Sequence, residues 1–163
     1  MTRLYGWGEK SARVNDYVPD VRFERSSIIA TLGLDGINAP MTYTGTLNSE
    51  VFRPYVEQFL APTLEEGDVV ILDNYSVHKV KGILDPIYAK GAEVLFLPTY
   101  SPDLNPIEMA WSKIKAILRK LKPRSNEDMQ IAMKTALDAI TKTDAESWFS
   151  HDGYFLSPKY VNV

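Results

Sequence analysis

Short apolar runs alternate with amphipathic stretches along the chain, a pattern typical of an α/β fold. The runs 28–32 and 37–44 flank a turn-forming Asp-Gly pair and therefore predict a β-hairpin. Two further apolar runs, 69–72 and 94–97, show no polar alternation, which is typical of parallel strands covered on both faces. The chain is thus expected to form a mixed sheet flanked by helices.

Helical periodicity marks the intervals between and after these strands. Asn48 is placed to cap a first helix that carries Pro54, which is expected to kink the helix or delay its start. A second helical stretch is expected over about 78–90. Longer amphipathic helices are predicted over 106–121 and about 126–140.

Composition is that of an ordinary globular protein. The 163 residues are 45% hydrophobic and 24% charged, which suits one domain with a sizeable core. Cysteine is absent, so disulfides and Cys-based zinc sites are excluded. No apolar run approaches the roughly 20 residues of a membrane helix, and the first residues lack the apolar stretch of a signal peptide. A cytoplasmic protein without a membrane segment is therefore expected.

Basic residues are concentrated in one stripe. The net charge is −3, from 18 basic and 21 acidic residues, yet residues 113–124 contain six bases and no acid. Two interpretations remain open: a surface that binds DNA phosphates, or a solvated helix face whose basic end suits the helix dipole. The basic stripe comprises Lys113, Lys115, Arg119, Lys120, Lys122 and Arg124, and the first five are the candidate DNA contacts.

Two short motifs each place a carboxylate where both could meet at one site. Asp73 directly follows the strand 69–72, and Glu108 lies in the first turn of the long helix expected downstream. Carboxylates at a strand tip and a helix start can converge on a divalent ion, and paired Mg²⁺ ions suit phosphodiester chemistry. Each acid also has a purely structural explanation. Asp73 could form a turn with Asn74, and Glu108 could complete a capping box with Asn105.

Neighbouring residues in these motifs favour structural roles. His78, near an expected helix start, is expected at the surface, and Trp111 in the core. Asp103 is expected to shape the turn before the helix rather than to bind a metal.

Together the two motifs resemble those of the DDE transposases of the mariner superfamily, in particular their bacterial insertion-sequence relatives. The second motif is the more specific one, and the interval of 34 residues between Asp73 and Glu108 fits the family pattern. The resemblance implies a single RNase H-like catalytic domain over 1–163, with a helical extension over about 125–163. The matching residues are Leu72-Asp73-Asn74 with His78, the string from Leu97 to Glu108 with Trp111, and, more weakly, Gly36-Ile37, Gly45-Thr46-Leu47-Asn48 and Tyr5-Gly6-Trp7.

The resemblance further implies metal-dependent cleavage and transfer of DNA strands. Asp73 and Glu108 would be the second and third metal-binding acids of a triad, with Mg²⁺ (or Mn²⁺) as the cofactor. The implied partners are DNA, as transposon ends and target, and either a second copy of the chain or the upstream half of a split transposase.

The chain departs from the family pattern at the first acid of the triad. In the family this Asp stands on the first, central strand, usually as an Asp-Glu pair just upstream of the Gly-Trp segment, and a helix-turn-helix region precedes it. Here only six residues precede Trp7, and Asp16, Asp20 and Asp35 lie on the wrong side of that landmark. The fold is therefore expected to lack its first central strand. An isolated chain is expected to be poorly folded or to pair its open edge with another chain.

Three functions remain open from the sequence. The first is a truncated transposase domain with impaired or no independent activity. The second is a catalytically inactive DNA-binding or dimerising remnant of a transposase. The third, an unrelated α/β module for a small ligand, is disfavoured because no Gly-rich phosphate loop follows any strand.

Overall fold

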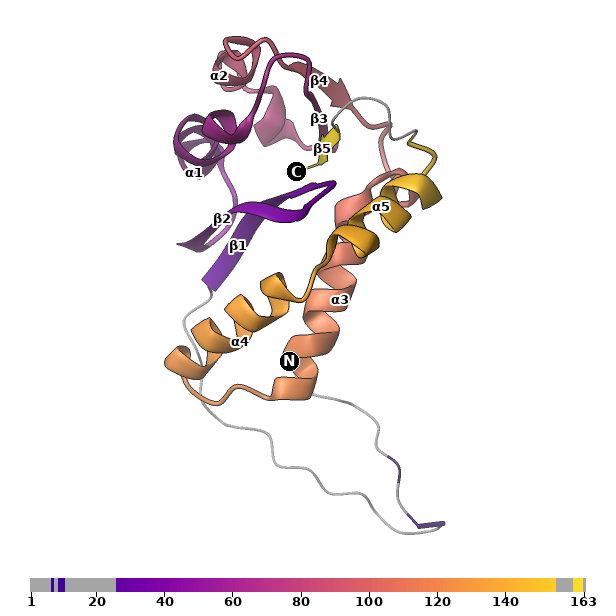
Figure 1. Cartoon of the computed structure of the whole chain (residues 1–163). Coiled ribbons are helices and arrows are strands. Elements are labelled where there is room, and N and C mark those ends of the chain that lie inside the picture. The colour runs from indigo at the N-terminus through magenta and orange to yellow at the C-terminus, as the bar shows by residue number, and fades with distance from the viewer. Residues whose placement is uncertain (1–6, 8, 11–25, 155–159, 163) are drawn as a thin grey trace.

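Among the described residues, five strands form one mixed sheet, in the order β2 (Gly36–Thr44), β1 (Ser26–Gly33), β5 (Tyr160–Asn162), β3 (Val69–Leu72) and β4 (Glu93–Phe96). The structure is a computed structural model that describes residues 7, 9–10, 26–154 and 160–162. Helices lie on both sides of the sheet: α1 (Ser49–Tyr55) and α2 (Asp85–Tyr88) on one side, and α3 (Pro106–Leu121), α4 (Asn126–Asp138) and α5 (Lys142–His151) on the other (Figure 1). This arrangement confirms the mixed sheet flanked by helices that the sequence predicted.

The predicted hairpin is formed by β1 (Ser26–Gly33) and β2 (Gly36–Thr44), which pair antiparallel. Gly36 stands in the turn with a φ of 120°, a conformation that only glycine adopts readily. The two apolar runs downstream form β3 (Val69–Leu72) and β4 (Glu93–Phe96), which pair in parallel as predicted.

The connection between β3 and β4 differs from the prediction. A continuous helix over 78–90 does not form. The chain instead makes a 3₁₀ turn at Ser76–Lys79 and a single helical turn, α2, at Asp85–Tyr88. Gly82, between these two turns, has a φ of 75°, which interrupts a right-handed helix at that point.

β5 (Tyr160–Asn162) occupies the centre of the sheet. It runs antiparallel to β1, where it pairs with Leu32 and Gly33, and parallel to β3, where it pairs with residues 69–71. The sequence predicted a gap at this position. The structure instead fills the gap with a strand from the C-terminal part of the chain, which supplies hydrogen-bond partners to backbone groups on both sides.

Pro54 does not delay the start of the first helix, which begins directly after Asn48. Asn48 caps α1 (Ser49–Tyr55), and its side chain accepts a first-turn backbone N–H at 3.0 Å. Pro54 has no N–H to donate inside this helix. Shortly after it the chain widens into a π-helical stretch at Val56–Leu60 and then tightens into a 3₁₀ turn at Ala61–Thr63.

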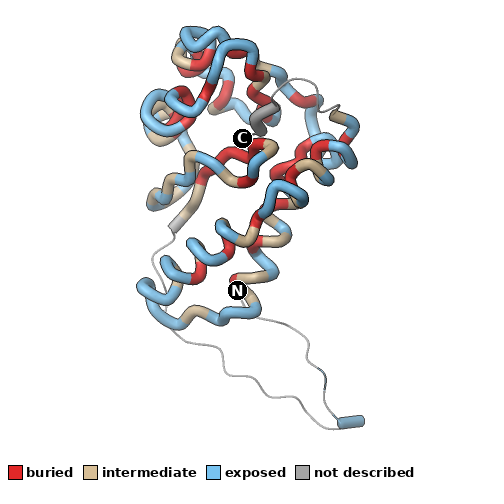
Figure 2. Tube along the Cα trace, in the orientation of Figure 1, coloured by how far each residue is buried: buried red, intermediate tan, exposed pale blue. Residues whose placement is uncertain are grey.

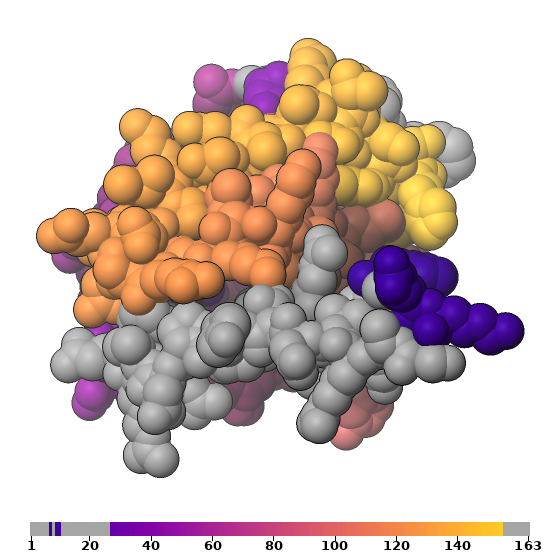
Figure 3. All heavy atoms as spheres, turned by 90° about the horizontal axis from the view of Figure 1, so that it is seen from below, coloured from indigo at the N-terminus to yellow at the C-terminus, as the bar shows by residue number. Residues whose placement is uncertain are grey.

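Three helices follow β4. α3 (Pro106–Leu121) and α4 (Asn126–Asp138) have closely the predicted bounds, and α5 (Lys142–His151) follows them. Seen from below, α3 and α4 in orange adjoin α5 in yellow in one continuous surface (Figure 3). Among the described residues, no helix has both the length and the apolar content to cross a membrane.

Two apolar cores lie on the two faces of the sheet, and buried residues gather along its centre and the inner helix faces (Figure 2). Alternation along β3 decides which core each residue enters. Val70 and Leu72 join the core beneath α1 and α2, whereas Ile71 joins Leu32 and Phe149 in the core beneath α3, α4 and α5. The sheet is therefore covered on both faces, as continuous apolar strands require.

Candidate active site

Asp73 and Glu108 line the same cleft, whose volume is about 420 Å³. Asp73 directly follows β3, and Glu108 lies in the first turn of α3, each in the position expected from its motif. The loop 97–105, which follows β4, builds the wall between them. Because β3 and β4 are parallel, their carboxyl ends meet at one edge of the sheet, and the cleft opens there.

His78 holds the carboxylate of Asp73. Nδ1 of His78 lies 3.0 Å from Oδ1 of Asp73, and the backbone N–H of Tyr75 donates to the same oxygen at 3.0 Å. The hydrogen bond from His78 is the main cause that lowers the pKa of Asp73; the Tyr75 amide adds to it, and partial burial opposes it. Asp73 is therefore a fixed, ionised carboxylate at neutral pH, with its side chain 55% exposed to the cleft.

The expectation that His78 lies at the surface is wrong. The residue is only 5% exposed, and its ring packs against Phe52 with 4.5 Å between ring centroids. His78 lies in the 3₁₀ turn five residues after Asp73. Its burial results from packing against α1, which is distant in the sequence.

Glu108 is not part of a capping box. Asn105, at the start of α3, makes no side-chain cap hydrogen bond, and only its backbone carbonyl accepts the N–H of Glu108, at 3.0 Å. The structural explanation that the sequence left open for Glu108 is therefore wrong. Its side chain is exposed at the cleft, near the helix N-terminus.

Two amide oxygens on the cleft have no hydrogen-bond partner among the described residues. They are Oδ1 of Asn74 and Oδ1 of Asn105, and both are buried. Asn74 donates through its amide nitrogen to Oγ1 of Thr99 at 2.9 Å, which leaves its oxygen directed elsewhere. The cleft therefore offers two carboxylates and two neutral oxygens, a donor set that suits a hard cation such as Mg²⁺ or Mn²⁺.

The first acid of the family triad has no counterpart among the residues that the structure describes. Across residues 7, 9–10, 26–154 and 160–162, no group of three His, Asp or Glu side chains is gathered to hold a metal. Asp16 and Asp20 lie outside the described residues. The donor set thus fits a divalent metal at Asp73 and Glu108 but is one carboxylate short of the family triad.

Tyr100 stands on the rim of the cleft, a feature that the sequence did not indicate. Its φ is 58°, which is uncommon for a residue other than glycine, and its side chain is 98% exposed. Uncommon backbone conformations of this kind cluster at functional sites. An exposed aromatic ring beside the two acids offers a face on which a nucleic-acid base can stack.

Comparison of the sequence with known families assigns the chain to one of them. Residues 1–130 match the family described as DDE superfamily endonuclease. The chain belongs to the DDE superfamily of endonucleases. This confirms the family resemblance carried by the two acid motifs.

Two solved structures share the fold of this DDE endonuclease chain. One is described as "Crystal structure of the Mos1 Strand Transfer Complex", with a TM-score of 0.68 and 18% identity over 94% of this chain and 51% of that one. The other, "Mos1 transposase paired-end complex with left transposon end", has a TM-score of 0.64 and 17% identity over 94% and 52%. The chain spans about half the length of both, and their likeness confirms the RNase H-like fold. No curated protein sequence matches the chain.

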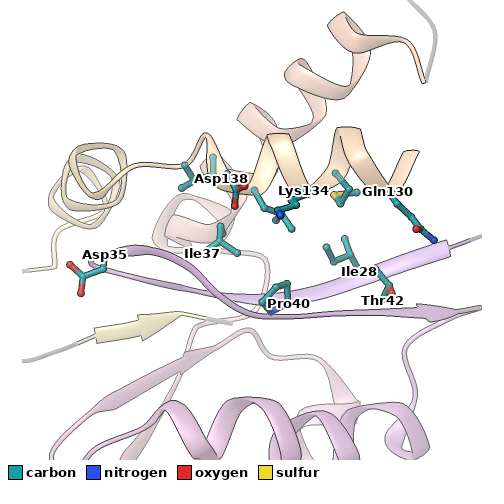
Figure 4. A pocket seen from close by; sticks show the side chains of 11 residues that line it. Ile28, Asp35, Ile37, Pro40, Thr42, Gln130, Lys134 and Asp138 are labelled. Carbon is teal, nitrogen blue, oxygen red and sulfur yellow. The ribbon is translucent and has the colours of Figure 1, made fainter. Parts of the chain in front are cut away.

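A larger cavity of about 620 Å³ lies between the β1–β2 hairpin and α4 (Figure 4). Its walls are mostly apolar, with Lys134 and Asp138 among the exceptions. Asp35 also lies there and forms an ion pair with Lys142, 3.4 Å from Nζ to Oδ1. Asp35 is thus at a different cavity from Asp73.

The basic stripe runs along α3, away from the cleft. Lys115, Lys120, Lys122 and Arg124 are exposed, and Arg119 is half-buried. Lys113 forms an ion pair with Asp144 at the start of α5. This ion pair gives Lys113 a role in attaching α5 to α3. The other five side chains of the basic stripe lie wholly or partly at the surface.

Proposed function

We propose that this chain is a transposase catalytic domain of the mariner type, built for metal-dependent cleavage and transfer of DNA strands. The observation that carries the proposal is the placement of Asp73 and Glu108 on one cleft in a chain of the DDE endonuclease family. Both solved structures with the same fold are described as complexes of the Mos1 transposase system, which supports DNA as the substrate.

Asp73 and Glu108 would hold divalent metal in this cleft, with Mg²⁺ or Mn²⁺ as the cofactor. Bound metal supplies activation of a water or a DNA 3′-hydroxyl for in-line attack on phosphorus, and stabilisation of the leaving oxygen. The residues of the chain prepare that site. His78 and the Tyr75 amide fix Asp73 in its ionised form, while the orphaned oxygens of Asn74 and Asn105 offer neutral donors beside it.

Activity of the chain alone is expected to be impaired, because the described residues bring two acids to the cleft rather than three. Losing one carboxylate weakens metal binding and misplaces the remaining ligands. Besides DNA, the proposed partners are a second copy of the chain or the upstream half of a split transposase.

DNA is expected to lie along the basic stripe. Lys115 and Arg119 are spaced at i and i+4 on α3, and Lys122 follows at the C-terminal cap of that helix. Phosphate contacts carry no base information, so the binding should be weak, independent of sequence and sensitive to salt. Replacing these three residues by Glu should abolish it, and unchanged binding would assign the stripe to a solvated helix face.

Nicking of supercoiled plasmid DNA tests the catalytic proposal. The full chain is assayed with Mg²⁺ or Mn²⁺, alone and together with an upstream segment that contains an Asp-Glu strand. We expect little nicking by the chain alone, clear nicking with the segment, and loss of nicking in Asp73→Asn and Glu108→Gln. Nicking that persists in both variants would show that the cleft is not the active site.

The second candidate function is a DNA-binding remnant without catalytic activity. The absence of a three-acid cluster among the described residues favours it. DNA binding that depends on the basic stripe, with no nicking even after the Asp-Glu segment is added, would establish this function in place of the first.

A further inference from the structure

The start of α3 lacks a side-chain cap of its own and is held from a distant part of the chain. The side chain of Asn105 makes no cap hydrogen bond, although Glu108 in the next turn lines the cleft. The hydroxyl of Tyr154, which follows α5, donates to the backbone carbonyl of Leu104 at 2.7 Å. This hydrogen bond joins residues 50 positions apart in the sequence and ends directly before α3.

The end of α5 fixes the place of Tyr154. The N–H of Gly153, whose φ is 88°, donates to the carbonyl of Ser150 at 3.2 Å. The N–H of Tyr154 donates to the carbonyl of Phe149 at 2.9 Å. Two such bonds around a left-handed glycine form a Schellman motif, in which the residue after the glycine packs back on the last turn of the helix. The Tyr154 ring indeed packs edge-on against the fully buried Phe149, so its hydroxyl has a defined position.

α5 joins α3 at both of its ends. Near the start of α5, Asp144 forms an ion pair with Lys113 of α3. Beyond the end of α5, Tyr154 reaches Leu104. Between these contacts Phe149 enters the same apolar core as the buried face of α3. α5 therefore lies along the first half of α3 and braces the segment that enters it (Figure 1).

The braced carbonyl lies close to Glu108 along the backbone. Leu104 ends a 3₁₀ turn, and its N–H donates to the carbonyl of Ser101 at 3.2 Å. Pro106 follows with a φ that its ring fixes, and the carbonyl of Asn105 accepts the N–H of Glu108 at 3.0 Å. The backbone between Leu104 and Glu108 is therefore stiff, and the position of the Leu104 carbonyl sets the direction in which α3 begins.

We propose that Tyr154 is a positioning residue for Glu108. By holding the Leu104 carbonyl it fixes the start of α3, and with it the separation of the Glu108 and Asp73 carboxylates across the cleft. Metal ligands must be held within about 0.5 Å of their productive geometry, a precision that supporting contacts have to supply. The effect on metal rests on the proposed function, whereas the bracing of the turn does not.

Amide hydrogen exchange of the full chain tests the brace. Tyr154→Phe removes the hydroxyl and keeps the ring against Phe149. Losing this hydrogen bond should speed amide exchange within 104–108 by about fivefold, while α4 keeps its exchange rates. Tyr55→Phe is the matched control, because it removes a buried hydroxyl that has no partner among the described residues, and it should leave 104–108 unchanged.

Two results of the exchange measurement would overturn the proposal. One is unchanged exchange over 104–108 in Tyr154→Phe, which would show that the hydroxyl does not hold the turn. The other is an equal acceleration over 104–108 and in α4, which would show that Tyr154 supports the whole fold rather than the start of α3.

The affinity for Mn²⁺ tests whether the brace acts through Glu108. Tyr154→Phe should weaken Mn²⁺ binding by about threefold or more, because groups that orient a metal ligand affect its affinity. In Glu108→Gln the same substitution should weaken binding no further, since the ligand that Tyr154 positions is gone. An equal loss in both backgrounds would overturn the positioning of Glu108.

Together the two measurements separate this inference from the proposed function. A chain that binds Mn²⁺ with no response to Tyr154→Phe would keep the proposed metal site and overturn the positioning role. A chain that binds no Mn²⁺, but shows the faster exchange confined to 104–108, would support the brace and contradict the proposed metal site.

Discussion

The start of α3 at the cleft contrasts with the starts of α4 and α5. Ser125 and Asp128 form a complete capping box on α4, and Thr141 and Asp144 form one on α5. The sequence suggests the same device for α3, yet Asn105 makes no side-chain cap and its buried oxygen has no partner among the described residues. The starts of α4 and α5 thus satisfy their polar groups locally and the start of α3 does not, although among the described residues Tyr55 and Asp152 also carry a buried oxygen without a partner away from the cleft.

This difference affects the stability of the start of α3. A buried acceptor without a partner costs about 1–3 kcal/mol, so the beginning of α3 is less stable than its sequence would allow. Asn74 carries a second such oxygen on the same cleft, and Tyr100 beside it has a strained backbone.

The largest expected effect is in the core of the scaffold. Phe149 is fully buried and packs edge-on against Tyr154, with 5.8 Å between ring centroids. Phe149→Ala should lower the free energy of unfolding by about 3–5 kcal/mol. Glu108→Gln, on the exposed cleft, should change it by no more than about 0.5 kcal/mol. Urea unfolding of both variants checks the contrast, and an equal loss in Glu108→Gln would give that residue a structural role.

Asp144 should make a smaller contribution to the free energy of unfolding, and this contribution should depend on pH. The hydrogen bond from Lys113, followed by those from Thr141, lowers the pKa of Asp144 from 3.8 to about 2. The folded state therefore favours the ionised carboxylate, and this stabilisation is complete above the usual pKa and is lost as the pH falls through about 2. Asp144→Asn should cost about 1–2 kcal/mol at pH 7. Thermal unfolding at pH 7 and near pH 2 checks this, since the two proteins should converge at the lower pH.

Removing the capping side chain should destabilise the protein by about 1 kcal/mol at α4 and α5 but not at α3. Ser125→Ala and Thr141→Ala each remove a side-chain acceptor from a backbone N–H, at 3.0 and 3.2 Å respectively. Each should lower the free energy of unfolding by about 1 kcal/mol. Asn105→Ala removes an unpartnered oxygen and should be neutral or slightly stabilising. If Asn105→Ala lost as much stability as Ser125→Ala and Thr141→Ala, the start of α3 would not differ from the starts of α4 and α5.

Periodicity and motif spacing predicted most of the elements that position the site. The hairpin, β3, β4, α3 and α4 followed from apolar patterns and turn residues within each segment. The placement of Asp73 and Glu108 at one sheet edge followed from their positions after a strand and at a helix start. These features are local, so they can be recognised without knowing what packs against them.

The features that the sequence did not predict depend on distant contacts. β5 has three residues, too few to show a period, and its place is set by β1 and β3. His78 is buried because Phe52 of α1 covers it. Asn105 carries the residue type of a helix cap, and only the three-dimensional structure shows that its side chain does not cap.

Binding of Mn²⁺ to the full chain tests the central claim most directly, namely that Asp73 and Glu108 form one metal site. Titration calorimetry should show weak binding, with a Kd on the order of 0.1–1 mM for so few carboxylates. Asp73→Asn and Glu108→Gln should each weaken it by about tenfold or more, while Asp35→Asn, at the other cavity, should leave it unchanged. Mn²⁺ affinity that is the same in Asp73→Asn, Glu108→Gln and the unchanged chain would contradict the claim.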